Sequence, residues 1–154
     1  MNVACWHAAQ PTILLSRFPQ LTHMTSQGTH LFTDFWGCTP AVLQDEELLR
    51  RTVTHAVQLA GATLCALHSV PFPSRVPGEN GGVTVVAILA ESHLTIHTYP
   101  EAEFAAVDLY TCGPRGTPRR GLDYFKEVLR PSRYVVREVV RGVDPEPRLS
   151  LMGH

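Results

Sequence analysis

The sequence lacks several features that would place a protein in a class at once. No apolar run approaches the roughly 18 residues of a membrane span, and the net charge of −1 offers no basic surface to a nucleic acid. The four cysteines form no C-x-x-C pair and no disulfide framework, so reduced thiols in a cytoplasm are expected. These absences argue against a membrane protein, a nucleic-acid-binding protein and a disulfide-rich secreted domain.

What the chain does have is enough apolar sequence for one core: 154 residues, of which 44% are hydrophobic and 18% charged. Residues 1–23 show no regular hydrophobic period, and no basic residue precedes Arg17, which argues against a signal peptide. We expect residues 1–23 to be a disordered extension, or translation to begin at Met24. Residues 24–154 are expected to form a single domain.

Hydrophobic periodicity predicts the secondary structure of that domain. Strands are predicted over residues 30–36, 62–67, 83–89, 94–98, 104–111 and 134–140, and helices over 40–60, with Thr39 as N-cap, and 121–129. The continuous apolar run 83–89 predicts a strand buried on both faces or nearly so, and the proline- and glycine-rich segment 69–82 predicts a loop. The short connections predict an α+β fold, a two-layer α/β sandwich with a mainly antiparallel sheet and helices on one face.

Ser92 follows Glu91 at the expected end of a strand. A serine there is most often a turn residue. The alternative is self-cleavage, in which Ser92 Oγ attacks the Glu91 carbonyl, the amide becomes an ester, and a base removes the serine α-proton so that Glu91 leaves as a carboxylate. The remaining dehydroalanine hydrolyses to a pyruvoyl group and ammonia. This route requires oxyanion donors and a base, and His97 is the candidate base because the ordinary pKa of histidine is near neutral.

The histidines allow two other interpretations. His93 and His97 would share a metal ion on a helix, but the alternating residues predict a strand, in which about 13 Å separates them. Metal binding is therefore not expected. A core imidazole with satisfied hydrogen bonds stays an open alternative for His93 and is the preferred interpretation of His68.

Cys112 ends a predicted strand and precedes Gly113. An inert buried cysteine is the common case, and a proton donor or nucleophile near an imidazole is the alternative. A cysteine–histidine hydrolase that pairs Cys112 with His97 stays open, although the sequence identifies no oxyanion hole. The absence of a G-x-S-x-G motif disfavours a serine hydrolase, and the glycine-rich segment 78–82 precedes a strand, which favours a turn over a phosphate-binding loop.

Two long motifs resemble a known family. They are ESHLTIHTYPE at residues 91–101 and AVDLYTCG at residues 106–113. Together with GTHL at 28–31 and DFWGC at 34–38, they resemble the prokaryotic S-adenosylmethionine decarboxylases, which are pyruvoyl-dependent enzymes of polyamine synthesis. The likeness extends over about residues 28–140.

The resemblance implies cleavage between Glu91 and Ser92, with a β chain that ends at Glu91 and an α chain that begins with a pyruvoyl group made from Ser92. It assigns His97 to proton abstraction during processing and Cys112 to proton donation during decarboxylation. A small-molecule substrate would form a Schiff base with the pyruvoyl carbonyl, so no exogenous cofactor and no metal are implied. Two αβ units would form a homodimer, without a nucleic acid or membrane partner.

Phe72, Thr84 and Leu94 are the candidate substrate-binding residues. Relatives commonly have serine at the position of Thr84, and a phenylalanine that can stack on adenine at the position of Val70. Here Phe72 lies two residues further on, in a longer proline-rich loop. S-adenosylmethionine is therefore the first hypothesis for the substrate, arginine or ornithine is the alternative on the same fold, and an unprocessed binding or regulatory homologue is the alternative outside the enzymes.

Overall fold

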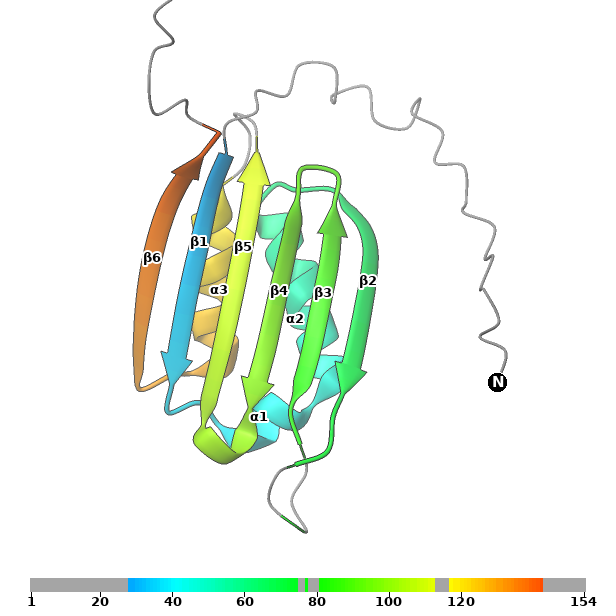
Figure 1. The fold of residues 1–154 in the computed structure, drawn as a ribbon, viewed down its shortest axis with the longest axis vertical. Helices are drawn as coiled ribbons and strands as arrows, with labels where there is room; N and C mark the ends of the chain where they lie inside the picture. The colour runs from blue at the N-terminus through cyan, green and yellow to red at the C-terminus, as the bar shows by residue number, and fades with distance from the viewer. Residues whose placement is uncertain (1–27, 75–76, 78–80, 113–116, 143–154) are drawn as a thin grey trace, which may run out of the picture.

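The computed structural model describes residues 28–74, 77, 81–112 and 117–142. In this part of the chain a six-stranded sheet carries helices on one face only (Figure 1). Its strands are β1 (Gly28–Trp36), β2 (Leu64–Pro71), β3 (Val83–Leu89), β4 (His93–Tyr99), β5 (Phe104–Cys112) and β6 (Arg133–Arg141). They lie in the order β2-β3-β4-β5-β1-β6, and every neighbouring pair is antiparallel. The predicted two-layer α+β sandwich is confirmed, whereas the predictions for residues 1–23 lie outside the described residues.

The predicted helix over residues 40–60 is in fact two helices, α1 (Pro40–Gln44) and α2 (Glu46–Leu59). The break is at Asp45, whose extended backbone ends α1 and whose carboxylate accepts a hydrogen bond of 2.9 Å from the Leu48 N–H. An aspartate at this position is a favourable N-cap. The sequence therefore holds the signal for a second helix start, which the hydrophobic period of residues 40–60 does not reveal.

The last helix, α3 (Pro118–Leu129), begins earlier than the predicted Gly121 because Pro118 takes a first-turn position. Gly121 lies inside the helix, where α3 packs on α2. A Cβ at this position would lie 2.7 Å from the carbonyl oxygen of Ala56. The close approach of the two helices explains a glycine that the sequence suggested as a helix start.

Two strand predictions were wrong in detail. β2 includes residues 69–71 of the predicted loop, and it ends in Pro71. It is an edge strand, where a missing N–H is tolerated. β3 is buried on one face only, since Val83, Val85, Ala87 and Leu89 are buried while Ile88 is 48% exposed. The continuous apolar run predicts near-complete burial of both faces, but the described residues place no second layer over the face that carries Ile88.

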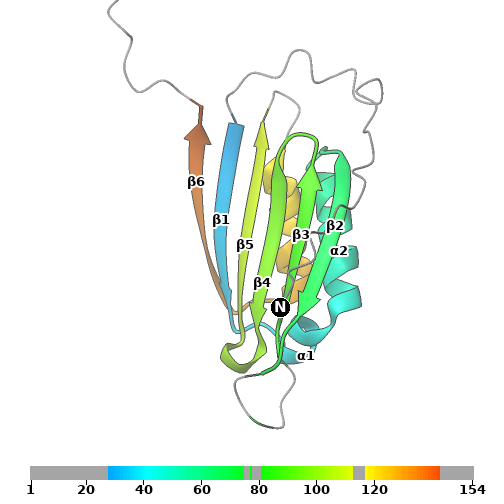
Figure 2. The same ribbon diagram turned by 45° about the vertical axis from the view of Figure 1, so that its right-hand side comes forward.

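The core lies between the sheet and the helices, and it includes Leu31 and Phe35 of β1, Leu94 and Ile96 of β4, and Phe125 of α3. We call the other side of the sheet the open face, and Figure 2 shows it turned away from all the helices. One row across it, linked by strand register, consists of Ile88, His93, Tyr110, His30 and Val139. Among the helices that the structure describes, none combines the length and hydrophobicity needed to span a bilayer.

Candidate active site

The turn between β3 and β4 carries Glu91 and Ser92 to the end of β5, at one edge of the open face (Figure 1). The Cys112 thiol donates a hydrogen bond of 2.5 Å to the main-chain carbonyl oxygen of Glu91. Ser92 Oγ lies 3.2 Å from Nδ1 of His93. We call Glu91, Ser92, His93 and Cys112 the junction cluster. It joins a hydroxyl, an imidazole and a thiol around one peptide bond.

Burial raises the pKa of the Cys112 thiol, a backbone hydrogen bond opposes this, and the charge of Glu91 raises the pKa further. The thiol therefore stays protonated near neutral pH and remains a hydrogen-bond donor. The oxygen that it contacts would carry the negative charge if a nucleophile attacked the Glu91 carbonyl. A donor fixed at such an oxygen stabilises a tetrahedral intermediate. The junction cluster thus supplies the oxyanion donor that sequence reasoning did not identify.

His97 belongs to a second group at the opposite end of β4. Its Nδ1 lies 2.6 Å from Oγ1 of Thr84 on β3, and its ring stacks on Phe72, with centroids 4.9 Å apart and an interplanar angle of 11°. Tyr99 packs edge-on against the same ring at 4.5 Å. We call Phe72, Thr84, His97 and Tyr99 the His97 cluster. Burial lowers the pKa of His97, with Glu101 acting in the opposite sense, so the imidazole is neutral near pH 7 and can accept a proton.

The two clusters do not meet within one chain. Ser92 and His97 are separated by five residues of extended chain, which is about 16 Å. The strand register pairs His97 with Ala106, six residues before Cys112 on β5, which is about 20 Å. A Cys112–His97 pair within one chain, as the hydrolase alternative requires, is therefore excluded. Of the predicted site residues, Phe72 and Thr84 lie with His97, and Glu91 and Cys112 lie with Ser92.

Other predicted residues lie away from both clusters. Leu94 is fully buried in the core, on the face opposite His93 and Cys112, because neighbouring residues of a strand point to opposite sides. His68 is exposed on β2, so the preferred interpretation of a core imidazole was wrong. His93 is half-buried and lies 5.7 Å from the ring of His30. Within the described ranges, no three His, Cys, Asp or Glu side chains are grouped closely enough to hold a metal ion.

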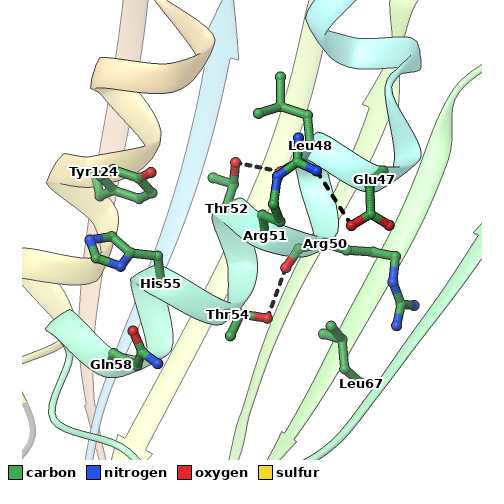
Figure 3. Close-up of a pocket in the computed structure, with 10 residues that line it drawn as sticks. All are labelled: Glu47, Leu48, Arg50, Arg51, Thr52, Thr54, His55, Gln58, Leu67 and Tyr124. Atoms are coloured by element: carbon green, nitrogen blue, oxygen red, sulfur yellow. Dashed lines mark hydrogen bonds and ion pairs between the residues drawn. The ribbon is translucent and has the colours of Figure 1, made fainter.

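A surface hollow lies on the helical layer, not on the open face. Figure 3 shows it over the outer surface of α2, with Arg50 and His55 on α2 and Tyr124 on α3 among its lining residues. The core separates it from the junction and His97 clusters. It therefore contributes no group to the chemistry described above.

Known proteins are similar to the part of this chain that contains the junction cluster and the His97 cluster. The family model for S-adenosylmethionine decarboxylase matches residues 29–142. An S-adenosylmethionine decarboxylase proenzyme of Bacillus anthracis is 39% identical over 116 residues, which are 75% of this chain and 89% of the relative. An arginine decarboxylase proenzyme of Ignicoccus hospitalis is 41% identical over 120 residues, which are 78% of this chain and 81% of the relative.

A solved structure shares the fold. The crystal structure of the adenosylmethionine decarboxylase from Aquifex aeolicus matches with a TM-score of 0.68 at 32% identity, over 80% of this chain and 97% of the other. The family model covers all of β1 to β6 except Gly28, and both clusters lie inside it. This chain belongs to the S-adenosylmethionine decarboxylase family of self-processing, pyruvoyl-dependent decarboxylases.

Proposed function

We propose that this chain cuts itself between Glu91 and Ser92 and then decarboxylates S-adenosylmethionine, producing an aminopropyl donor for polyamine synthesis. The N-terminal fragment would end at Glu91 and the C-terminal fragment would begin at residue 92. The observation that carries the proposal is the hydrogen bond from the Cys112 thiol to the Glu91 carbonyl oxygen. An inert cysteine needs no partner at that atom, whereas self-cleavage needs a donor there.

Cleavage begins when Ser92 Oγ forms a bond to the Glu91 carbonyl carbon. The bond from that carbon to the Ser92 nitrogen breaks, and the nitrogen gains the proton that the hydroxyl loses. Cys112 stabilises the negative charge on the carbonyl oxygen in between. A neutral imidazole then takes the Ser92 α-proton, the Cβ–O bond breaks, and Glu91 departs as a carboxylate. The dehydroalanine that remains tautomerises to an imine, and water hydrolyses the imine to release ammonia and leave a ketone at residue 92.

The residues around the junction fit a pyruvoyl group made in place, because its precursor serine, an imidazole and a protonated thiol already lie together. The group supplies a carbonyl that takes up the electrons released when carbon dioxide leaves the substrate. Cys112, protonated at neutral pH, then holds the proton that the substrate α-carbon needs. The same thiol thus serves two steps from one position.

The base is proposed to come from a second copy of the chain, as a homodimer. A twofold axis running across the strands would stack two open faces and lay the junction end of one sheet over the His97 end of the other. His97 of one copy would then approach Ser92 of the other copy. The Ser92 of its own chain lies about 16 Å away. The open face suits such burial, since it exposes the apolar side chains of Phe32, Val70, Ile88, Val135 and Val139.

The stacked rings of Phe72 and His97 support S-adenosylmethionine as the substrate, because a flat aromatic surface favours contact with a purine. The second candidate substrate is arginine, because the relative from Ignicoccus hospitalis is named an arginine decarboxylase proenzyme. Release of carbon dioxide from S-adenosylmethionine, arginine and ornithine separates them. Phe72→Ala should weaken turnover of S-adenosylmethionine by about 2- to 10-fold, as expected for loss of one aromatic contact, and leave turnover of arginine unchanged.

Intact-mass spectrometry tests the proposal as a whole. The purified chain should yield two fragments that meet at residues 91 and 92, the second carrying a pyruvoyl terminus. Ser92→Ala should stay uncut and inactive, while Ser132→Ala, a matched change beside β6, should be cut normally. A wild-type chain that stays whole and lacks pyruvate would refute the proposal and favour a binding or regulatory homologue.

A further inference from the structure

The side chain of Glu91 is held on both oxygens by one residue. The Thr63 N–H donates to Oε2 at 2.8 Å, and Thr63 Oγ1 donates to Oε1 at 3.1 Å. A third bond, from the Ala90 N–H to the Thr63 carbonyl oxygen at 3.0 Å, joins the same two segments. Thr63 precedes β2 and lies 28 residues from Glu91 in sequence. Three hydrogen bonds therefore tie the junction turn to the start of an edge strand.

This anchor acts on the same residue as the Cys112 thiol. Cys112 holds the carbonyl oxygen of Glu91, and Thr63 holds its carboxylate. With both ends fixed, the peptide plane between residues 91 and 92 has little freedom to rotate. Attack by a neighbouring hydroxyl depends on such fixed geometry, since small displacements of reacting atoms slow a reaction strongly.

The anchor also keeps the charge of Glu91 in one place. A carboxylate is stabilised by two donors at once, because charge-assisted hydrogen bonds are stronger than neutral ones. Glu91 is half-buried, and its charge raises the pKa values of both Cys112 and Cys65. A side chain free to swing would carry that charge toward the oxygen that must become negative during attack. Thr63 prevents this by binding the carboxylate at the edge of the sheet.

We infer that Thr63 is a positioning residue for self-cleavage, which fixes the scissile peptide through the Glu91 carboxylate. The inference rests on the proposed cleavage between Glu91 and Ser92. It also extends beyond the cut, because residues 63 and 91 stay in the same fragment. The anchor therefore keeps the new C-terminus beside the start of β2 after cleavage, clear of the new N-terminus at residue 92.

The test compares Thr63→Val with Thr63→Ser. Valine keeps the shape and the backbone N–H but removes the hydroxyl, whereas serine retains it. Freshly synthesised precursor is followed over time by intact mass, so that the rate of cutting is measured rather than decarboxylation. Thr63→Val should cut about tenfold more slowly, which corresponds to about 1.4 kcal/mol of barrier, and Thr63→Ser should cut at close to the wild-type rate.

Thr54→Val is the control, because it makes the same change in a threonine on α2 whose hydroxyl donates to the Arg50 carbonyl oxygen, away from the junction cluster. Thr63 is the more exposed of the two threonines, so the control is the more demanding test of stability. Thr54→Val should cut at the wild-type rate. Thermal unfolding of uncut Ser92→Ala chains, with and without Thr63→Val, shows whether the second change merely destabilises the fold. Equal rates for wild type and Thr63→Val, or equally slow rates for the valine and serine variants, would overturn the inference while leaving the proposed function intact. A wild-type chain that never cuts would overturn both.

Discussion

The Cys112 thiol and the Glu91 carbonyl oxygen are hydrogen-bonded although 21 residues separate them in sequence. The strand register explains the contact, because β5 runs antiparallel to β4 and its last residue arrives beside the turn that precedes β4. The atom that would carry charge during cleavage thus meets a donor on a rigid strand end.

Replacing that donor should slow the cut. Cys112→Ala is expected to reduce the rate of self-cleavage by about 100- to 1,000-fold, the usual effect of removing one oxyanion donor. Cys112→Ser replaces the thiol with a hydroxyl donor, so the rate of self-cleavage should fall much less. Time courses of fragment formation by mass spectrometry measure both. Normal cutting by Cys112→Ala would mean that the thiol takes no part in this step.

Cleavage should also depend on pH through His97. Burial lowers the pKa of His97 from its ordinary value of 6.5, so the neutral base persists below that pH. The cleavage rate should stay level from pH 8 to about 6.5 and fall only at lower pH, as the imidazole gains a proton. His97→Gln should be slow at every pH and lose the dependence. A profile centred above 6.5 would contradict this assignment.

The same shift has a consequence for stability. His97 and His30 both have pKa values lowered by burial, with Asp108 opposing the effect at His30. Below pH 6.5 the unfolded chain binds protons that the folded chain excludes, so the free energy of unfolding falls with falling pH. Urea unfolding of the uncut Ser92→Ala chain at pH 5 and pH 8 measures the difference. His30→Phe should reduce this difference in the free energy of unfolding between pH 5 and pH 8.

Complementation tests whether one active site is built from two chains. Ser92→Ala and His97→Ala should each be defective alone. In a mixed dimer, the His97→Ala copy supplies Ser92 and Cys112 while the Ser92→Ala copy supplies His97, so one site is complete. Coexpression should therefore restore cutting of the His97→Ala chain. If mixed dimers form and this chain still stays whole, the base acts within its own chain.

Leu94 should behave as a core residue. Its side chain is fully buried, so Leu94→Ala is expected to lower the free energy of unfolding by about 2–5 kcal/mol. The KM of the folded, processed variant should match that of wild type, because the side chain faces the helices. Chemical denaturation and steady-state kinetics measure the two effects. A raised KM with unchanged stability would return Leu94 to the substrate site.

Local regularities explain how much of the fold was predictable. Alternation along β4 and β5 follows from one buried face, and it is visible in any short window of sequence. The break at Asp45 was missed although its capping signal is local, because hydrophobic periodicity does not register a cap. The strand character of residues 69–71 was missed because an edge strand depends on its pairing with a neighbouring strand outside that window. The substrate-site assignment of Leu94 stays a prediction that its burial argues against, since periodicity assigns a residue to one of two faces but does not say which face carries the chemistry.

By itself, the sequence determined the chemical groups: a serine after a carboxylate, an imidazole five residues on and a cysteine at a strand end. Only the tertiary structure decided which of them meet. Antiparallel register brings Cys112 and Thr63 to Glu91 from 21 and 28 residues away, whereas the extended backbone of β4 carries His97 away from Ser92. The reason is geometric: a strand separates its own residues by about 3.3 Å at each step, and pairing between strands brings distant ones together.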